Sequence, residues 1–142
     1  MKLIKNIECQ SCTSVLCNIR QDVKAACLDF GYPDADINNI VLAIDEACAN
    51  VIRYGYKYCE KGWVGLKIYD NGSEAVFHIS DRCAEICEAD LAVKPRSDDQ
   101  PGGLGLHIIH EVMDSVHLVD GPVEGNTLEL RKQLPPKEAQ GQ

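Results

Sequence analysis

Residues 41–56 read VLAIDEACANVIRYGY and lie within the clearest helical pattern of the chain. From Ile37 to Ile52, apolar residues recur at intervals of three and four, which predicts an amphipathic helix with one buried face. Asp34 or Asp36 can cap the start of this helix by accepting a hydrogen bond from a free backbone amide.

The segment before this helix predicts a strand and another helix. Residues 3–8 have the pattern of a short strand, and apolar residues recur at helical intervals from Cys12 to Phe30. Gly31 is expected to end that helix, and Pro33 enforces the break before the next one.

The segment after the central helix predicts a hairpin. Residues 63–81 read WVGLKIYDNGSEAVFHISD, in which apolar and polar residues alternate on both sides of Asn71 and Gly72. An Asn-Gly pair supplies the positive φ angles that a tight hairpin turn requires, so two antiparallel strands are predicted.

The last third of the chain begins with an irregular polar stretch over residues 82–103. A loop of this length in a small domain is more typical of a functional segment, such as a lid, than of a connector. A helix over 104–115 and strands over 116–119 and 127–134 are predicted next. The tail over 135–142, PPKEAQGQ, is expected to be disordered.

This order of elements predicts an α+β two-layer sandwich. A mixed, mostly antiparallel sheet would have three helices on one face, and its other face would be partly open. The chain has 142 residues, a length that suits a single domain, here expected over residues 1–134.

Charge and hydropathy exclude several classes of function. The net charge of −8 argues against direct binding to nucleic acid, which requires clustered lysine and arginine. The first ten residues, MKLIKNIECQ, have too short an apolar run for a secretory signal, and no stretch approaches the ~20 apolar residues that cross a bilayer. These features predict a cytoplasmic protein that does not bind membranes.

The eight cysteines are expected to be reduced thiols that act mainly as small buried hydrophobic residues. A metal-binding alternative also exists. Cys9 and Cys12 are spaced C-x-x-C, and Cys83 and Cys87 are spaced C-x-x-x-C, so four thiolates could hold a metal if the two pairs met in space.

Two polar residues of the central helix are candidates for chemistry. Glu46 and Asn50 are four residues apart, so they lie on the same helix face, expected to be opposite the apolar stripe. The carboxylate can take a proton from a nucleophile, and the carboxamide can supply an oxygen to Mg²⁺. The alternative is that both side chains simply point to water.

Two further features suggest a ligand site. Asp81 ends a predicted strand, where its carboxylate can accept a hydrogen bond from a ligand amine above the sheet. Residues 101–106 read PGGLGL, and the bare amides of Gly102, Gly103 and Gly105 at a helix start can approach a phosphate. The alternative is an ordinary flexible loop with a glycine packed close to the sheet.

The order of these motifs and predicted elements resembles that of the histidine-kinase-like ATPases, which share a nucleotide fold with gyrase. Among them, it resembles the small anti-sigma-factor serine kinases. The resemblance spans residues 4–134. DEACANVIRYGY resembles the N box, PGGLGLHII the second glycine box and GNTLEL the closing Gly-x-Thr element. The first glycine box usually reads Asp-x-Gly-x-Gly, whereas here Cys83 and Glu85 stand in place of the glycines. Tyr54 stands where these kinases often have histidine.

The resemblance implies a Bergerat-type ATP-binding fold and a role for each matched residue. Glu46 would be the general base, Asn50 would hold Mg²⁺ and Asp81 would read adenine. Thr127 would support Asp81 through its hydroxyl. The phosphates of ATP would be wrapped by the segment made of Gly102, Gly103, Leu104, Gly105 and Leu106.

The resemblance also implies partners. The protein would phosphorylate a serine of a STAS-domain anti-sigma-factor antagonist, would alternatively hold a sigma factor inactive, and would form a homodimer. Two alternatives start from the altered first glycine box. Cys83 and Glu85 together suggest a non-catalytic partner-switching adaptor that has lost the nucleotide. Cys83 alone suggests a pocket in which oxidation of the thiol blocks nucleotide entry.

Overall fold

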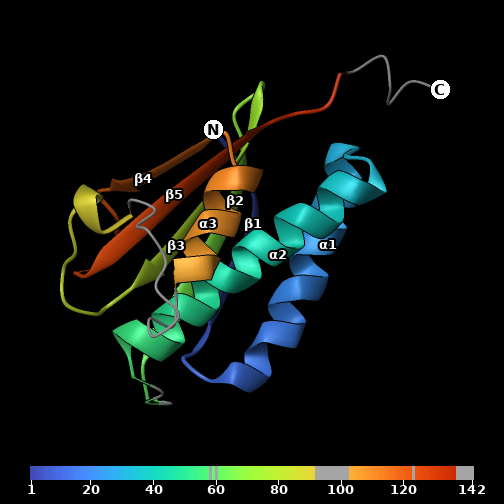
Figure 1. The fold of residues 1–142 in the computed structure, drawn as a ribbon. Helices are drawn as coiled ribbons and strands as arrows, with labels where there is room; N and C mark the ends of the chain where they lie inside the picture. The colour runs from blue at the N-terminus through green and yellow to red at the C-terminus, as the bar shows by residue number, and fades with distance from the viewer. Residues whose placement is uncertain (58, 60, 92–102, 123, 137–142) are drawn as a thin grey trace.

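A computed structural model describes residues 1–57, 59, 61–91, 103–122 and 124–136, with side chains left undescribed at 103–105. The main elements are β1 (Lys2–Gln10), α1 (Leu16–Phe30), α2 (Asp34–Asn50), β2 (Trp63–Asp70), β3 (Glu74–Asp81), α3 (Gly103–Val112), β4 (Ser115–Val119) and β5 (Asn126–Gln133). Short helical turns are η1 (Thr13–Val15), η2 (Val51–Gly55) and η3 (Glu88–Leu91). The predicted α+β order is confirmed, and Figure 1 shows the helices lying together in front of the sheet.

The strands form one five-stranded sheet in the order β1-β2-β3-β5-β4. Every strand pair of the described residues is antiparallel, so the parallel component of the predicted mixed sheet is not found there. The two central strands, β3 and β5, pair Asp81 with Asn126 at one end. This register places residues 45 positions apart in the chain side by side.

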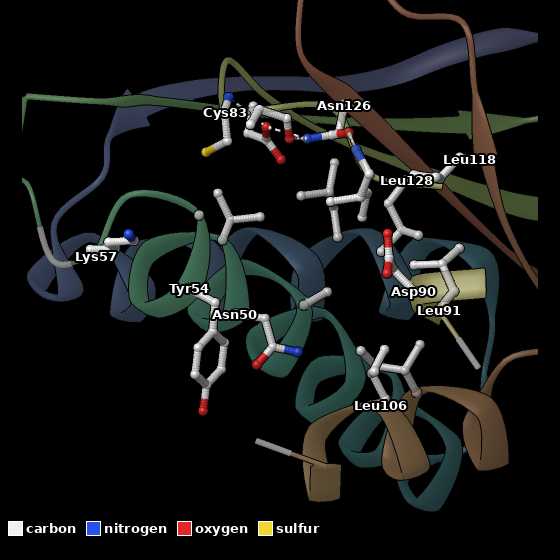
Figure 2. A pocket seen from close by; sticks show the side chains of 18 residues that line it. Asn50, Tyr54, Lys57, Cys83, Asp90, Leu91, Leu106, Leu118, Asn126 and Leu128 are labelled. Carbon is white, nitrogen blue, oxygen red and sulfur yellow. Dashed lines mark hydrogen bonds between the residues drawn. The ribbon is translucent and has the colours of Figure 1, made fainter. Parts of the chain in front are cut away.

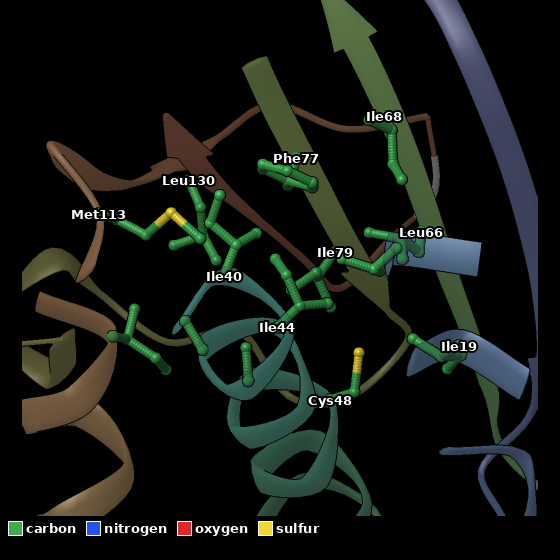
Figure 3. Packing of buried hydrophobic residues seen from close by; sticks show 14 of the residues in the cluster. Ile19, Ile40, Ile44, Cys48, Leu66, Ile68, Phe77, Ile79, Met113 and Leu130 are labelled. Carbon is green, nitrogen blue, oxygen red and sulfur yellow. The ribbon is translucent and has the colours of Figure 1, made fainter. Parts of the chain in front are cut away.

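The core lies between the helices and the inner face of the sheet. Ile40 and Ile44 of α2 are fully buried, as are Phe77 and Leu130 of the central strands. Figure 3 shows α2 pointing Ile40, Ile44 and Cys48 toward these strands. Burial of each such aliphatic side chain contributes on the order of 2 kcal/mol to folding, so the apolar stripe read from the sequence anchors α2 under the sheet.

Two local predictions need correction. Pro33 is the N-cap residue of α2 and no side chain caps the helix, so neither Asp34 nor Asp36 has the predicted role. Both lie in the first turn, where a carboxylate is stabilised by the helix dipole instead.

The turn between β2 and β3 also differs from the prediction, because Gly72 has a positive φ of 94° but Asn71 does not. The loop has three residues, and Asn71 acts through its side chain: Oδ1 accepts hydrogen bonds from the amides of Ser73 and Glu74.

The outer face of the sheet carries a ladder of paired polar side chains. Glu129 accepts hydrogen bonds from His78 Nε2 at 2.9 Å and from Arg131 Nε at 2.7 Å, and Arg131 also reaches Glu74 at 3.2 Å. The hydrogen bond from Arg131, followed by the one from His78, holds the pKa of Glu129 below its ordinary value of 4.5, against the opposing effect of burial.

This ladder predicts a pH-dependent contribution to stability. A carboxylate whose pKa is lowered on folding stabilises the protein above pH 4.5, and this contribution is lost as the pH falls through the lowered pKa. We expect Glu129→Gln to cost about 1 kcal/mol near neutral pH and progressively less below about pH 4. Urea denaturation across this range measures the difference, and an equal cost at both ends would show that the charge of Glu129 does not contribute.

Two predicted features lie partly outside the described residues. The polar stretch over 82–103 is described as far as η3 and again from the start of α3, and the tail as far as Pro136. Among the described residues, no helix is both long and apolar enough to span a membrane.

Candidate functional site

A cavity of about 440 Å³ lies between α2, η2, the inner face of β3 and β5, η3 and α3. Its polar and charged lining side chains are Asn50, Tyr54, Lys57, Asp81, Cys83, Asp90 and Asn126. Figure 2 shows Cys83 and Asn126 on one side of the cavity and Asn50 and Leu106 on the other. The cavity therefore brings together residues that the sequence placed in separate motifs.

Asp81 is almost completely buried, with 6% of its surface exposed. Its Oδ1 accepts hydrogen bonds from the amide of Cys83 at 2.8 Å and from Asn126 Nδ2 at 3.0 Å. Both of these bonds go to Oδ1, and the Cys83 thiol also lies within hydrogen-bonding reach of the carboxylate. Asp81 itself lines the cavity. This geometry suits recognition of an amino group, the role expected for Asp81.

Asn126 was not among the predicted site residues, although it organises this end of the cavity. Besides Asp81, its Nδ2 donates to the carbonyl of Ala84 at 3.0 Å, and its Oδ1 accepts from the amide of Ile86 at 2.9 Å. The signal was its place inside the Gly-x-Thr element, but only the pairing of β3 with β5 reveals its partner.

The prediction that the Thr127 hydroxyl contacts Asp81 is wrong. The Thr127 hydroxyl shares a 2.9 Å hydrogen bond with Ser80, and Asn126 contacts Asp81 instead. Successive strand residues face opposite sides of the sheet, so Thr127 pairs with Ser80 on the outer face while Asn126 and Asp81 share the inner face.

Glu46 and Asn50 differ in their surroundings. Asn50 lines the cavity, so the prediction that its face lies opposite the buried side is wrong for this residue. Glu46, one turn earlier, is outside the lining and lies 3.6 Å from Arg53, with 26% of its side chain exposed. An acid beside the cavity and a carboxamide inside it are compatible with a base and a metal ligand.

The start of α3 reaches the same cavity. The helix begins at Gly103, and Leu106 in its first turns lines the cavity. Gly102 lies outside the described residues. The phosphate-binding roles of Gly103, Leu104 and Gly105 remain predictions that rest on the backbone amides of this helix start.

Cys83 occupies the position of an expected glycine and packs against Gly55. A Cβ on Gly55 would approach Cys83 Sγ to 2.6 Å, so the missing side chain of Gly55 makes room for the thiol. Burial, with Asp81 as a second cause, raises the pKa of Cys83 to about 11. The thiol is therefore protonated at neutral pH, which contradicts the depressed pKa that an oxidation switch requires.

The four-thiolate metal site is also wrong. In the part of the chain that the structure describes, no group of three or more histidine, cysteine, aspartate or glutamate residues could hold a metal ion. Cys9 lies on β1, which β2 separates from β3 and the Cys83 loop. Free thiols are found at Cys9, Cys17, Cys27, Cys48, Cys59, Cys83 and Cys87.

Gly125 packs closely against the backbone of Asp81, so a substitution there tests the backbone of the site. It has a φ of 126°, and a Cβ there would overlap the Asp81 carbonyl oxygen. We expect Gly125→Ala to cost about 3 kcal/mol or more and to weaken ligand binding, because strain and a backbone clash add together.

The matched control is Gly72→Ala, because Gly72 also has a positive φ, 94°, but its added Cβ would meet nothing within 4 Å. This variant should cost only about 1 kcal/mol. Thermal melting of both variants measures the difference, and equal costs would show that contact with Asp81 is unimportant.

Comparison with known proteins decides the family. The model of the "Histidine kinase-like ATPase domain" family matches residues 12–132. The chain belongs to this family. In this histidine kinase-like ATPase domain, the match covers the elements from the start of α1 to β5, including Asn50, Asp81 and Asn126.

Several relatives of this histidine kinase-like ATPase are named as serine-protein kinases or anti-sigma factors. "Serine-protein kinase RsbW" of Bacillus licheniformis is 25% identical, with the match covering 70% of this chain and 68% of the relative. The protein of the same name from Halalkalibacterium halodurans is 32% identical, with 70% and 65% covered. "Anti-sigma F factor" of Clostridium beijerinckii is 26% identical, with 70% and 72% covered.

A solved structure is similar in fold. The RsbU and RsbW domains of Rv1364c from Mycobacterium tuberculosis match with a TM-score of 0.63 and 17% identity, over 94% of this chain and 34% of that chain. This likeness confirms the fold of the ATPase domain and, at such low identity, nothing further.

Proposed function

We propose that this chain is an ATP-dependent serine kinase that phosphorylates an anti-sigma-factor antagonist and alternatively holds a sigma factor inactive. The observation that carries this proposal is that Asp81 and Asn50 line the same cavity. The names of the relatives, serine-protein kinase and anti-sigma F factor, support the choice of substrate and partner.

Each residue has a role in the proposed reaction. Asp81 accepts a hydrogen bond from the adenine amino group, and the amides from Gly102 to Leu106 bind the phosphates. Asn50 fits Mg²⁺ because it presents a carboxamide oxygen, a hard ligand, to the cavity. Bound Mg²⁺ would neutralise phosphate charge during the transfer.

Glu46 acts on the protein substrate in this proposal. It takes the proton from the serine hydroxyl, whose oxygen bonds to the γ-phosphorus of ATP. The bond from that phosphorus to the bridging oxygen breaks, and ADP leaves. Positioning and charge neutralisation account for most of the catalysis of such a transfer, so one base, one metal ligand and an amide cradle are sufficient.

The partners follow from the same proposal. The antagonist is expected to be a STAS-domain protein, and the kinase is expected to work as a homodimer in the cytoplasm, where sigma factors act. The net charge of −8 is compatible with binding a basic surface of a sigma factor.

The test has two stages. Calorimetry with ATP and Mg²⁺ should show micromolar binding, which falls when Mg²⁺ is removed. Incubation with γ-labelled ATP and a purified STAS-domain antagonist should then transfer label to a serine of the antagonist. Binding without transfer to any antagonist would refute the kinase assignment.

A non-catalytic adaptor is the second candidate, and the side chains of Cys83 and Glu85 in the first glycine box favour it. Cys83 lines the cavity and narrows it beside Gly55. If calorimetry shows no binding of ATP while the chain still binds a sigma factor, the adaptor is the correct function.

A further inference from the structure

One wall of the cavity is made by η3, a short turn that precedes the undescribed stretch over 92–102. Asp90 and Leu91 of η3 line the cavity, and Leu91 is buried, with 6% of its surface exposed. Figure 2 shows both residues at the end of the cavity where Leu118 and Leu128 lie. The position of η3 therefore determines the shape of the space available to a ligand.

A histidine of α3 holds this wall in place. His110 Nε2 lies 2.7 Å from the carbonyl oxygen of Leu91. Because a carbonyl oxygen can only accept, Nε2 carries the proton and donates it. His110 itself is not among the described residues that line the cavity, whereas its partner Leu91 is.

Glu88 holds η3 to the sheet in a second place. Its Oε1 accepts a hydrogen bond from the amide of Leu118 at 2.8 Å, and its Oε2 lies 3.6 Å from His117 Nδ1. β4 is an edge strand of the sheet, and Glu88 supplies a hydrogen-bond acceptor for one of its amides. The turn is thus attached to both α3 and β4.

The turn is also braced internally. The carboxylate of Asp90 accepts a hydrogen bond from the Cys87 amide at 2.9 Å, while the Asp90 amide donates to the Cys87 carbonyl at 2.9 Å. Just before the turn, the Ile86 amide is held by Asn126. These hydrogen bonds fix the shape of the turn through contacts within the protein itself.

We propose that His110 is a positioning residue for nucleotide binding: its hydrogen bond to the Leu91 carbonyl docks η3 on α3 and forms the cavity wall before the nucleotide arrives. This inference rests on the proposed ATP binding. A preformed wall lowers the ordering cost of binding. The start of α3 also provides the predicted phosphate-binding amides. The same helix would therefore position η3 and bind the phosphates.

The test uses three variants of the full chain. His110→Leu removes the donor, and His110→Gln restores a donor with a similar reach. His107→Leu is the matched control, since His107 is on the same helix but, among the described residues, pairs with Glu111 at 2.9 Å, with 52% of its side chain exposed. Should His110→Leu fold poorly in a thermal melt, His110→Asn replaces it, because its amide is too short to reach Leu91.

Two measurements are made on each variant: ATP affinity by calorimetry and hydrogen exchange of residues 86–91 without nucleotide. We expect His110→Leu to bind ATP about five- to tenfold more weakly, the loss typical of one hydrogen bond, and to exchange faster in this segment. His110→Gln should behave nearly as the parent chain, and His107→Leu should change neither measurement.

The outcomes separate this inference from the proposed function. Unchanged exchange and affinity in His110→Leu would overturn it, and so would a His110→Gln variant as impaired as His110→Leu, because packing rather than the donor would then matter. If the parent chain binds no ATP, the proposed function fails, and with it the role of His110 in nucleotide binding. The exchange data would then report only whether His110 docks η3.

Discussion

Glu46→Gln is expected to lower phosphoryl transfer to the antagonist by about 10²–10⁴-fold, the usual contribution of a general base, while ATP binds with unchanged affinity. ATP affinity should stay unchanged because Glu46 is not among the described residues that line the cavity and lies 3.6 Å from Arg53. Glutamine keeps the size of the side chain but cannot take the serine proton. Single-turnover transfer of label from bound ATP measures the chemical step.

Asp34→Asn is the control for this variant. It makes the same change from carboxylate to carboxamide on α2, in the exposed first turn at the opposite end of the helix from Asn50. Transfer by Asp34→Asn should match that of the parent chain. Transfer retained by Glu46→Gln at the parent rate would remove Glu46 from the role of base.

Asp81→Asn is expected to weaken ATP binding by about ten- to hundredfold, because a hydrogen bond to a charged acceptor contributes roughly 1.5–3 kcal/mol. The same change should narrow the preference for ATP over GTP, since an asparagine amide can donate to the guanine oxygen whereas a carboxylate cannot. Calorimetric titrations with both nucleotides measure this ratio.

A fold control is needed for Asp81→Asn because Asp81 also accepts hydrogen bonds from Cys83 and Asn126 inside the protein. Thr127→Val is suitable, since it breaks the nearby bond to Ser80 but leaves the bonds of Asp81 in place. It should cost about 1 kcal/mol of stability. If Asp81→Asn changes the melting temperature but not the ATP to GTP ratio, Asp81 is structural and does not read the base.

Much of the fold could be predicted because it depends on local patterns. Helical spacing identified α1 and α2, and alternation identified β2 and β3, to within a few residues of their observed bounds. The local errors have local causes: Pro33 rather than an aspartate is the N-cap residue of α2, and a three-residue turn removes the need for a positive φ at Asn71.

The site was predicted less completely, because its contacts join distant parts of the chain. Asp81 and Asn50 were identified from motifs, and the structure brings both to one cavity. Asn126 and His110 were missed. Each acts through a partner on another element, and no spacing within one element reveals such a contact.

The sequence by itself determined the helices, the strands and the residue types available for chemistry, because side-chain periodicity records which face of an element is buried. Only the tertiary structure decided that Asn126 rather than Thr127 contacts Asp81, and that His110 holds η3. The physical reason is strand register: it sets which residues of β3 and β5 share a face, and a shift by one residue would exchange the two candidates.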